Sequence, residues 1–251
     1  MRLYAMTCGW LVGPMGNFLA GAEGQIRVPV PCFLIDHPDG LVLFDSGMHP
    51  QTQADARGRL GGITRIFQVE FASGEEVSAR LGALGADPAR VRYLINSHLH
   101  FDHTGGNAEI PNARLVVQRR EWEAGHDAEQ IRKQFYNPQD YQLGHDVVAV
   151  DGEHDVFGDG RVVCVPTYGH TPGHQSLRVE LDDGPVVLTA DACYLRRTLD
   201  DMHLPSVVDD PDAMRRSLER LRALRDAGAR LIYGHDPEAW RAVPQAPRPV
   251  D

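Results

Sequence analysis

Short apolar runs, separated by turn-forming residues, recur along the chain and predict a fold rich in β-strands. Each run has the length of a single strand, and glycine, proline, asparagine or aspartate usually bounds it. The step from Asp39 to Gly40 separates two such runs and is typical of a tight hairpin. The expected strands cover residues 1–8, 28–36, 41–45, 91–95, 114–118, 147–150, 161–166, 177–181, 186–190 and 230–233.

Helical patterns follow several of these strands. The expected helices cover residues 75–84, 119–124 and 211–226. Ser73 is a candidate N-cap and Gly85 a candidate end for the first, while Asp209 or Asp210 suits the start of the last. Residues 49–74 carry an apolar cluster without clean periodicity, which we interpret as a short helix and a lid.

Two segments have a different character. Residues 9–24 form a glycine-rich stretch with large apolar side chains and are expected to be a loop, whereas residues 125–141 are polar and weakly patterned. Groups of strands followed by helices occur twice, and no linker or change of composition divides the chain. We therefore expect one α/β domain over residues 1–251, an αββα sandwich of two mixed sheets packed face to face with helices outside.

The densest chemical signal is the segment His98-Leu99-His100-Phe101-Asp102-His103, directly after an expected strand. Imidazole and carboxylate donors together suit zinc or a similar first-row metal. If strand geometry continued past Asn96, His98 and His100 would point to the same side and could share one ion. Asp102 and His103 would then be free to turn towards a second ion.

Three later segments repeat one arrangement, in which a strand ends in a tight turn that carries a donor side chain. His170, Asp191 and His235 each occupy such a turn, beside glycine or another small residue. Side chains at neighbouring strand ends can meet at one edge of a sheet. The sequence therefore predicts a metal site built from several strand ends.

The composition of the chain indicates which kinds of partner and which compartment to expect. The net charge of −10 argues against nucleic acid, because binding to phosphates relies on clustered lysine and arginine. Four widely spaced cysteines form no C-x-x-C pair and indicate a reducing compartment. No signal-peptide pattern and no apolar stretch long enough for a membrane span are evident, so we expect a cytoplasmic protein. A homodimer is left open.

With these residues in place, the chain resembles the metallo-β-lactamase superfamily. The Asp45-Ser46-Gly47 turn, the H-x-H-x-D-H motif and the order of His170, Asp191 and His235 carry the resemblance over nearly the whole length. The resemblance implies two divalent metal ions, zinc foremost, with cobalt, manganese or iron also compatible. The implied ligands are His98, His100 and His170 for one ion, Asp102, His103 and His235 for the other, and Asp191 as the bridge.

The implied reaction is hydrolysis by a hydroxide that the two ions share, with Asp102 also counted as catalytic. Tyr194, three residues after Asp191, and the Thr171–Ser176 segment resemble the N-acyl-homoserine lactonases. In that group the equivalent phenol reaches the substrate near the scissile ester, so Tyr194 could stabilise developing negative charge. The expected substrate is a lactone with an acyl chain, and ring opening of this signal molecule would be quorum quenching.

Several alternatives stay open. A broader lactonase or esterase would use the same ligands, and so would a thioesterase similar to glyoxalase II, although few residues follow His235 to form that family's helical extension. A lactone-binding protein without turnover is the non-enzymatic alternative. We expect some of five apolar residues to line a hydrophobic groove for the acyl chain: Trp10, Met15, Phe18, Ile66 and Phe67. Cys193 is interpreted as packing, and His174 as a residue that orients the His170 turn.

Overall fold

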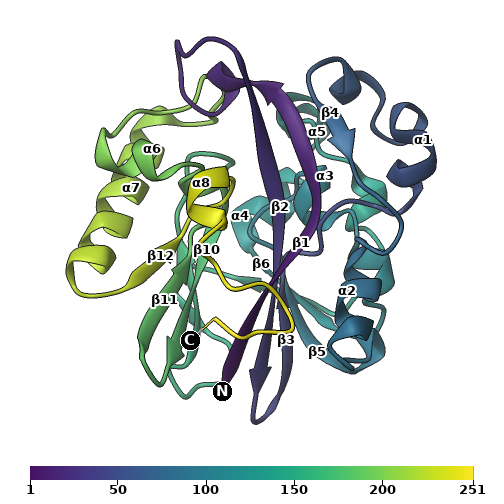
Figure 1. Cartoon of the computed structure of the whole chain (residues 1–251), viewed down its shortest axis with the longest axis vertical. Helices are drawn as coiled ribbons and strands as arrows, with labels where there is room; N and C mark the ends of the chain where they lie inside the picture. The colour runs from purple at the N-terminus through teal and green to yellow at the C-terminus, as the bar shows by residue number, and fades with distance from the viewer. Residues whose placement is uncertain (251) are drawn as a thin grey trace.

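Two β-sheets form the centre of the computed structural model, which describes residues 1–250 (Figure 1). Asp251, the last residue of the expected domain, lies outside the described residues. The larger sheet has seven strands in the order β4-β1-β2-β3-β5-β6-β7 and contains both antiparallel and parallel pairs. Its strands are β1 (Arg2–Pro14), β2 (Gln25–His37), β3 (Gly40–Phe44), β4 (Gln68–Glu70), β5 (Val91–Ile95), β6 (Arg114–Gln118) and β7 (Val147–Val150).

The smaller sheet has five strands in the order β12-β11-β10-β9-β8, and only β11 and β12 pair in parallel. Its strands are β8 (His154–Asp155), β9 (Val162–Pro166), β10 (Gln175–Leu181), β11 (Gly184–Leu188) and β12 (Arg230–Ile232). The helices are α1 (Gln51–Leu60), α2 (Val77–Ala83), α3 (Phe101–Thr104), α4 (Arg119–Ala124), α5 (Ala128–Gln134), α6 (Arg196–Asp200), α7 (Pro211–Asp226) and α8 (Pro237–Trp240).

Alternation along the strands produces three apolar layers. In β2, Phe33 and Ile35 face the core between the sheets, whereas Cys32 and Leu34 face the layer under α2. In the smaller sheet, Val187 faces α7 while its neighbours face the same central core. Helices α6 and α7 lie on one side of the paired sheets and α1 and α2 on the other (Figure 1). The expected αββα sandwich is therefore confirmed.

The strand prediction for the first residues was too short. Residues 9–14, expected to begin a loop, continue β1 as far as Pro14. The register of β1 on β2 shifts between Thr7 and Trp10, and Gly9 lies in this irregularity with a φ of +99°. Glycine adopts this backbone without a steric penalty, so the strand passes through a bulge where the sequence suggested a break.

Other element boundaries were predicted with mixed success. Val91–Ile95, Arg114–Gln118 and the helix Pro211–Asp226 have the expected bounds, and Asp210 caps that helix by accepting from two backbone N–H groups. The N-cap of α2 is Glu76, so the prediction of Ser73 was wrong. Strand β4 and helix α5 were missed, because a three-residue edge strand and a polar helix carry little hydrophobic periodicity.

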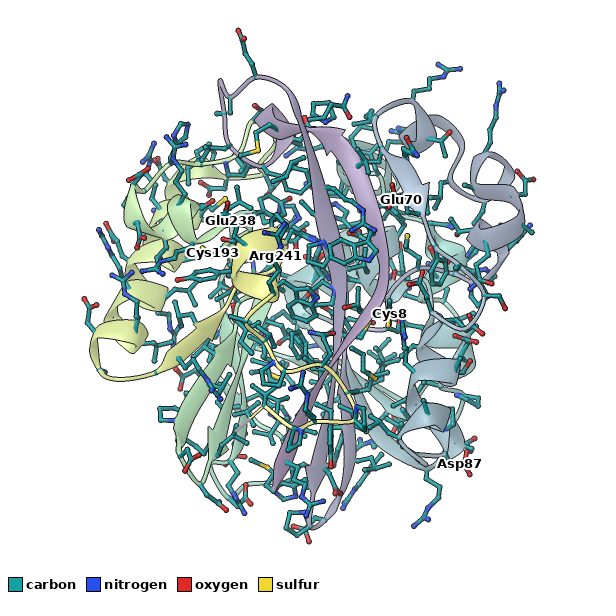
Figure 2. The ribbon with its side chains drawn as sticks, in the orientation of Figure 1. Cys8, Glu70, Asp87, Cys193, Glu238 and Arg241 are labelled. Atoms are coloured by element: carbon teal, nitrogen blue, oxygen red, sulfur yellow. The ribbon has the colours of Figure 1, made fainter. Side chains whose placement is uncertain are left out.

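The cysteines contribute packing. All four are free and buried. Cys193 lies beside α6 and α7 and packs with Leu199 and Met214, whereas Cys8 lies on the α2 side of β1 (Figure 2). The interpretation of Cys193 as a packed side chain is confirmed. Among residues 1–250, no helix combines the length and apolar character that crossing a membrane requires.

The bulge at Gly9 gives a test of how β1 is held. A Cβ atom there would lie 2.5 Å from Met48 Cε and 2.9 Å from Phe71 Cδ2. Gly9→Ala should therefore lower the free energy of unfolding by about 2 kcal/mol or more, through backbone strain and overpacking together. Urea denaturation measures the change. Gly62→Ala is the control, since nothing lies within 4 Å of its Cβ position; equal stability of the two variants would contradict this account.

Candidate metal centre

The structure brings all seven sequence-predicted donors into two adjoining groups. The ligand atoms within each group lie within 4.8 Å of one another. The first group contains His98, His100, His170 and Asp191, and the second contains Asp102, His103 and His235. All are buried except His100, which is partly exposed.

These donors come from the segments that follow strands, and two of them, Asp102 and His103, lie within α3. His98 and His100 follow β5, which ends at Ile95, so the strand does not continue past Asn96 as the sequence interpretation supposed. His100 nevertheless keeps an extended backbone, with φ −73° and ψ 156°, before α3 begins at Phe101. The two imidazoles still converge, with 2.8 Å between His98 Nε2 and His100 Nδ1.

Asp191 lies between the two groups. Its Oδ2 is 3.6 Å from His98 Nε2 and 3.3 Å from His170 Nε2. Its Oδ1 faces the other way, 3.3 Å from His103 Nε2 and 3.1 Å from His235 Nε2. One carboxylate therefore presents one oxygen to each group, which is the arrangement that a bridging ligand needs.

Hydrogen bonds on the far side of the rings fix which nitrogen faces the site. His100 Nε2 is 2.9 Å from the Gln134 carbonyl, and His235 Nδ1 is 2.7 Å from the Pro29 carbonyl. Each contact requires an N–H donor on that nitrogen, so in the neutral ring the opposite nitrogen keeps its lone pair. Ligand histidines in metalloproteins are oriented in this way.

Asp45 orients the imidazole ring of His103. Its Oδ2 lies 2.8 Å from His103 Nδ1, and its Oδ1 accepts from the Ser97 backbone N–H at 2.7 Å. Asp45 has a φ of +57°, a left-handed conformation that aspartate tolerates better than most residues. The acid noted at this strand tip therefore holds a donor ring in place.

His174 supports both the His170 turn and Asp191. Its Nδ1 lies 2.9 Å from Thr167 Oγ1, at the start of that turn, and its Nε2 accepts from the Asp191 backbone N–H at 3.1 Å. Burial lowers the pKa of His174 to about 3, which keeps it neutral and able to accept. This residue joins two of the turns that carry donors.

The pKa values of the donor histidines are shifted in different directions, depending on the charged groups nearby. Burial lowers the pKa of His98 and of His170 well below the usual value, which favours the neutral ring that binds metals. Burial also disfavours charge on His103, but Asp191, Asp102 and Asp45 outweigh it and raise that pKa well above its usual value. The second group thus attracts positive charge strongly.

The residues fit divalent metal ions. His103 Nε2 and Asp191 Oδ1 are buried and have no hydrogen-bond partner. Buried polar atoms are almost always satisfied, so two orphaned atoms facing each other indicate a missing electrophile rather than ordinary packing. Imidazole and carboxylate donors in two groups suit divalent cations of the first transition row.

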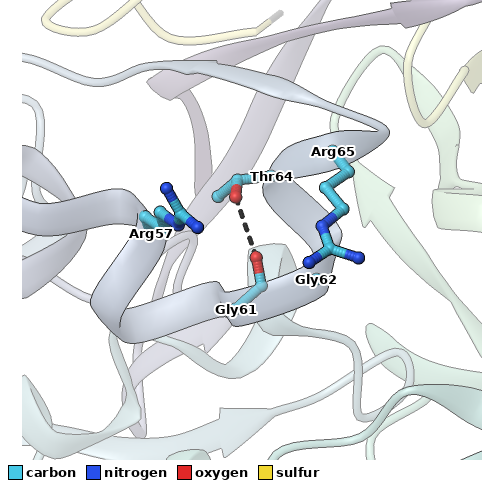
Figure 3. A pocket seen from close by; sticks show the side chains of 5 residues that line it. All are labelled: Arg57, Gly61, Gly62, Thr64 and Arg65. Atoms are coloured by element: carbon cyan, nitrogen blue, oxygen red, sulfur yellow. Dashed lines mark hydrogen bonds between the residues drawn. The ribbon is translucent and has the colours of Figure 1, made fainter.

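A separate surface hollow contains none of the seven donor side chains. A hollow of about 520 Å³ lies over α1 and η2 (Gly61–Arg65), lined by Arg57, Gly61, Gly62, Thr64 and Arg65 (Figure 3). It offers guanidinium groups but no imidazole or carboxylate. Six further histidines, at positions 37, 49, 126, 145, 154 and 203, belong to neither donor group among the described residues.

Sequence reasoning missed three supporting groups. The carbonyls of Pro29 and Gln134 carry no side-chain signal at all. Glu121, in the first turn of α4, is fully buried and bonded to the segments around the first donor group, yet its sequence context is that of an ordinary charged helix. Only the three-dimensional arrangement reveals these contacts.

Exchanging Asp45 for asparagine tests the orientation of His103. In Asp45→Asn the backbone can stay left-handed, but the amide must place its NH₂ against either the Ser97 N–H or His103 Nδ1. We expect metal affinity of the second group to fall roughly 10–100-fold. Metal analysis after dialysis against buffered zinc measures it; the exposed Asp39→Asn is the control. A full complement of metal in Asp45→Asn would contradict the assignment.

Comparisons with known proteins agree with this geometry. Residues 26–235 match the model of the metallo-beta-lactamase superfamily. The N-acyl homoserine lactonase AttM of Azorhizobium caulinodans is 38% identical over 98% of this chain and 97% of its own length. The N-acyl homoserine lactonase AiiA of Bacillus thuringiensis subsp. kurstaki is 32% identical over 85% and 83%, respectively.

Solved structures are similar over the same extent. An N-acyl homoserine lactone hydrolase, solved with the product N-hexanoyl-L-homoserine bound at its catalytic metal centre, superposes with a TM-score of 0.89 at 28% identity. The superposition covers 99% of this chain and 98% of that one. The chain therefore belongs to the metallo-beta-lactamase superfamily.

Proposed function

We propose that this chain is a metal-dependent hydrolase that opens the lactone ring of N-acyl-homoserine lactones, and thereby quenches quorum signals. The observation that carries the proposal is the placement of Asp191, with one oxygen facing each of two donor groups. Similarity to proteins named N-acyl homoserine lactonases over nearly the whole chain supports this substrate class. The activity would belong to one domain over residues 1–251.

We assign the resident ions as two zinc ions. His98, His100 and His170 would hold one ion, Asp102, His103 and His235 the other, and Asp191 both. Such a pair supplies hydroxide near neutral pH and polarises a carbonyl oxygen. Cobalt, manganese and iron suit the same donors, so metal analysis of the purified protein decides the identity.

We propose that Tyr194 donates a hydrogen bond at the reacting ester. Its hydroxyl lies 3.3 Å from His170 Nδ1, and if His170 presents Nε2 to the ion, Nδ1 carries the proton and donates to the phenol oxygen. Burial and the charge of Asp191 raise the pKa of Tyr194 well above its usual value, so the phenol keeps its own proton. That proton is then available to a developing oxyanion.

Asp102 is the second carboxylate of the site. Its Oδ2 lies 3.6 Å from the Nε2 atoms of both His103 and His235, too far for hydrogen bonds. An oxygen that is not saturated by protein donors can take the proton of the attacking water and return it to the ring oxygen that leaves. We therefore assign Asp102 a proton-transfer role in addition to metal binding.

Apolar side chains next to the donor groups suit an acyl chain. The ring of Phe18 lies 5.2 Å from that of Tyr194, 6.0 Å from His235 and 6.1 Å from Phe67, measured between centroids. Ile66, next to Phe67, is 46% exposed. We propose that Phe18, Phe67 and Ile66 line a groove for the acyl chain, with Met15 at its edge.

Trp10 does not belong to this groove. It packs against the core between the sheets, with the Arg27 guanidinium 3.8 Å over its ring. We therefore leave Trp10 out of the proposed groove, because the bulge at Gly9 keeps residue 10 within β1.

We also propose that the protein resides in the cytoplasm. Four free, buried thiols are typical of proteins that fold in a reducing environment, which supports the cytoplasm. No nucleic acid is expected as a partner of a chain with a net charge of −10.

Acid release tests the reaction. The zinc-loaded protein mixed with an N-acyl-homoserine lactone in weak buffer should release one acid per ring opened, and removal of the metal by a chelator should stop it. A panel of lactones of other ring sizes and of thioesters separates a selective lactonase from the broader hydrolases. Lactone binding without acid release would contradict the proposal and indicate a binding protein.

The role of Tyr194 has its own test. Tyr194→Phe should lower kcat by the equivalent of about 1–3 kcal/mol while metal content stays unchanged, because only a hydrogen bond to developing charge is lost. Steady-state kinetics measure the change. Tyr141→Phe is the control, since that buried hydroxyl donates to the Gly125 carbonyl and touches neither donor group. Equal kcat in the wild type and Tyr194→Phe would return Tyr194 to packing.

A further inference from the structure

One buried carboxylate outside the two donor groups has an unusually complete set of partners. Glu121 is fully buried and accepts four hydrogen bonds. Its Oε1 accepts from the Leu99 N–H at 3.0 Å and from the Tyr136 hydroxyl at 2.6 Å. Its Oε2 accepts from the Thr171 hydroxyl at 2.9 Å and from the Gly173 N–H at 2.8 Å.

Every one of these partners adjoins the first donor group. Leu99 is the residue between His98 and His100. Thr171 and Gly173 follow His170 in the turn after β9, and Tyr136 follows the Gln134 carbonyl that fixes the His100 ring. The three segments that place the three histidines of this group are therefore bonded to one side chain.

The close approach of α4 to the His170 turn is built into the backbone. A Cβ at Gly173 would lie 2.2 Å from the Glu121 backbone nitrogen, so only glycine allows this contact. Burial of a carboxylate is costly unless its oxygens are satisfied. The fold thus holds Glu121 at this point with donors on both oxygens, although Glu121 itself reaches neither donor group.

We propose that Glu121 is a positioning residue for the first metal ion: it sets the spacing of His98, His100 and His170 and thereby the affinity of that ion alone. The inference rests on the proposed metal centre and deepens it. Asp45 has the corresponding place in the second group, where it holds His103. Asp45 also reaches His98 of the first group through Ser97 Oγ, which lies 2.8 Å from Asp45 Oδ2 and 2.9 Å from His98 Nδ1. The contacts of Glu121, by contrast, lie around the first group.

Glutamine cannot replace Glu121 without a conflict. Each carboxylate oxygen faces one backbone N–H, and a backbone N–H cannot reverse its role as donor. Either orientation of the glutamine amide in Glu121→Gln would set its NH₂ group against the N–H of Leu99 or of Gly173. The substitution therefore keeps the shape of the side chain but breaks one of the two links between α4 and the histidine turns.

Cobalt binding to the metal-free protein tests the proposal without relying on turnover. The wild type should take up two Co²⁺ ions. Glu121→Gln should bind one ion with wild-type affinity and the other roughly 10–100-fold more weakly. Asp45→Asn should weaken the d–d absorption that Glu121→Gln retains, because Asp45 contacts His103 of the second group directly. Glu123→Gln, an exposed position on the same helix, is the matched control and should bind as the wild type does.

Two milder variants cover the case in which Glu121→Gln does not fold. Tyr136→Phe and Thr171→Val each remove one hydroxyl donor and leave the carboxylate and all seven candidate ligands in place. Each should weaken the same single ion by a few-fold, with the thermal midpoint measured alongside. Selective weakening of one ion supports the proposal. Wild-type affinity for both ions in all foldable variants, or equal weakening of both ions, overturns it.

The cobalt experiment distinguishes failure of the Glu121 proposal from failure of the lactonase proposal. A wild type that binds two ions but hydrolyses no lactone would refute the lactonase assignment and leave the cobalt comparison intact. A wild type that hydrolyses lactone while Glu121→Gln binds both ions normally would refute the role of Glu121 alone.

Discussion

The metal centre depends on one buried carboxylate facing two groups of imidazoles at once. Asp191 lies in η6 (Ala190–Ala192), directly after β11, and its two oxygens point to opposite groups. Parallel pairing of β11 with β12 brings His235 to the same edge. Gly234 allows the two turns to approach, since a Cβ there would lie 2.3 Å from the Ala190 carbonyl oxygen. Without that close approach, the second group would lose a donor.

The chemistry of the donors was predictable from the sequence because it lies in side chains with strong local signals. A metal ligand has to be His, Asp or a similar residue, and a strand end has to follow an apolar run. These two requirements identify the H-x-H-x-D-H motif that begins at His98 and the turns at His170, Asp191 and His235. The layered fold was predictable for the same reason, since buried strands such as β5 and β6 are largely apolar.

The remainder could not be predicted because it depends on backbone atoms and on distant pairings. The carbonyls of Pro29 and Gln134 orient two rings, yet any residue supplies a carbonyl. Glu121 stands in a charged helical segment, and only its contacts across the fold distinguish it from the exposed Glu123. The bulge at Gly9 misled the strand prediction, because glycine in a sequence favours a break and an irregular strand equally.

The order of the donors along the chain differs between the two groups. All members of the first group lie within residues 98–191, whereas the second group also needs His235, beyond α7 and β12. The second group therefore links the C-terminal part of the chain to the motif that begins at His98. A chain cut before β12 would still contain every donor of the first group but would lack one donor of the second.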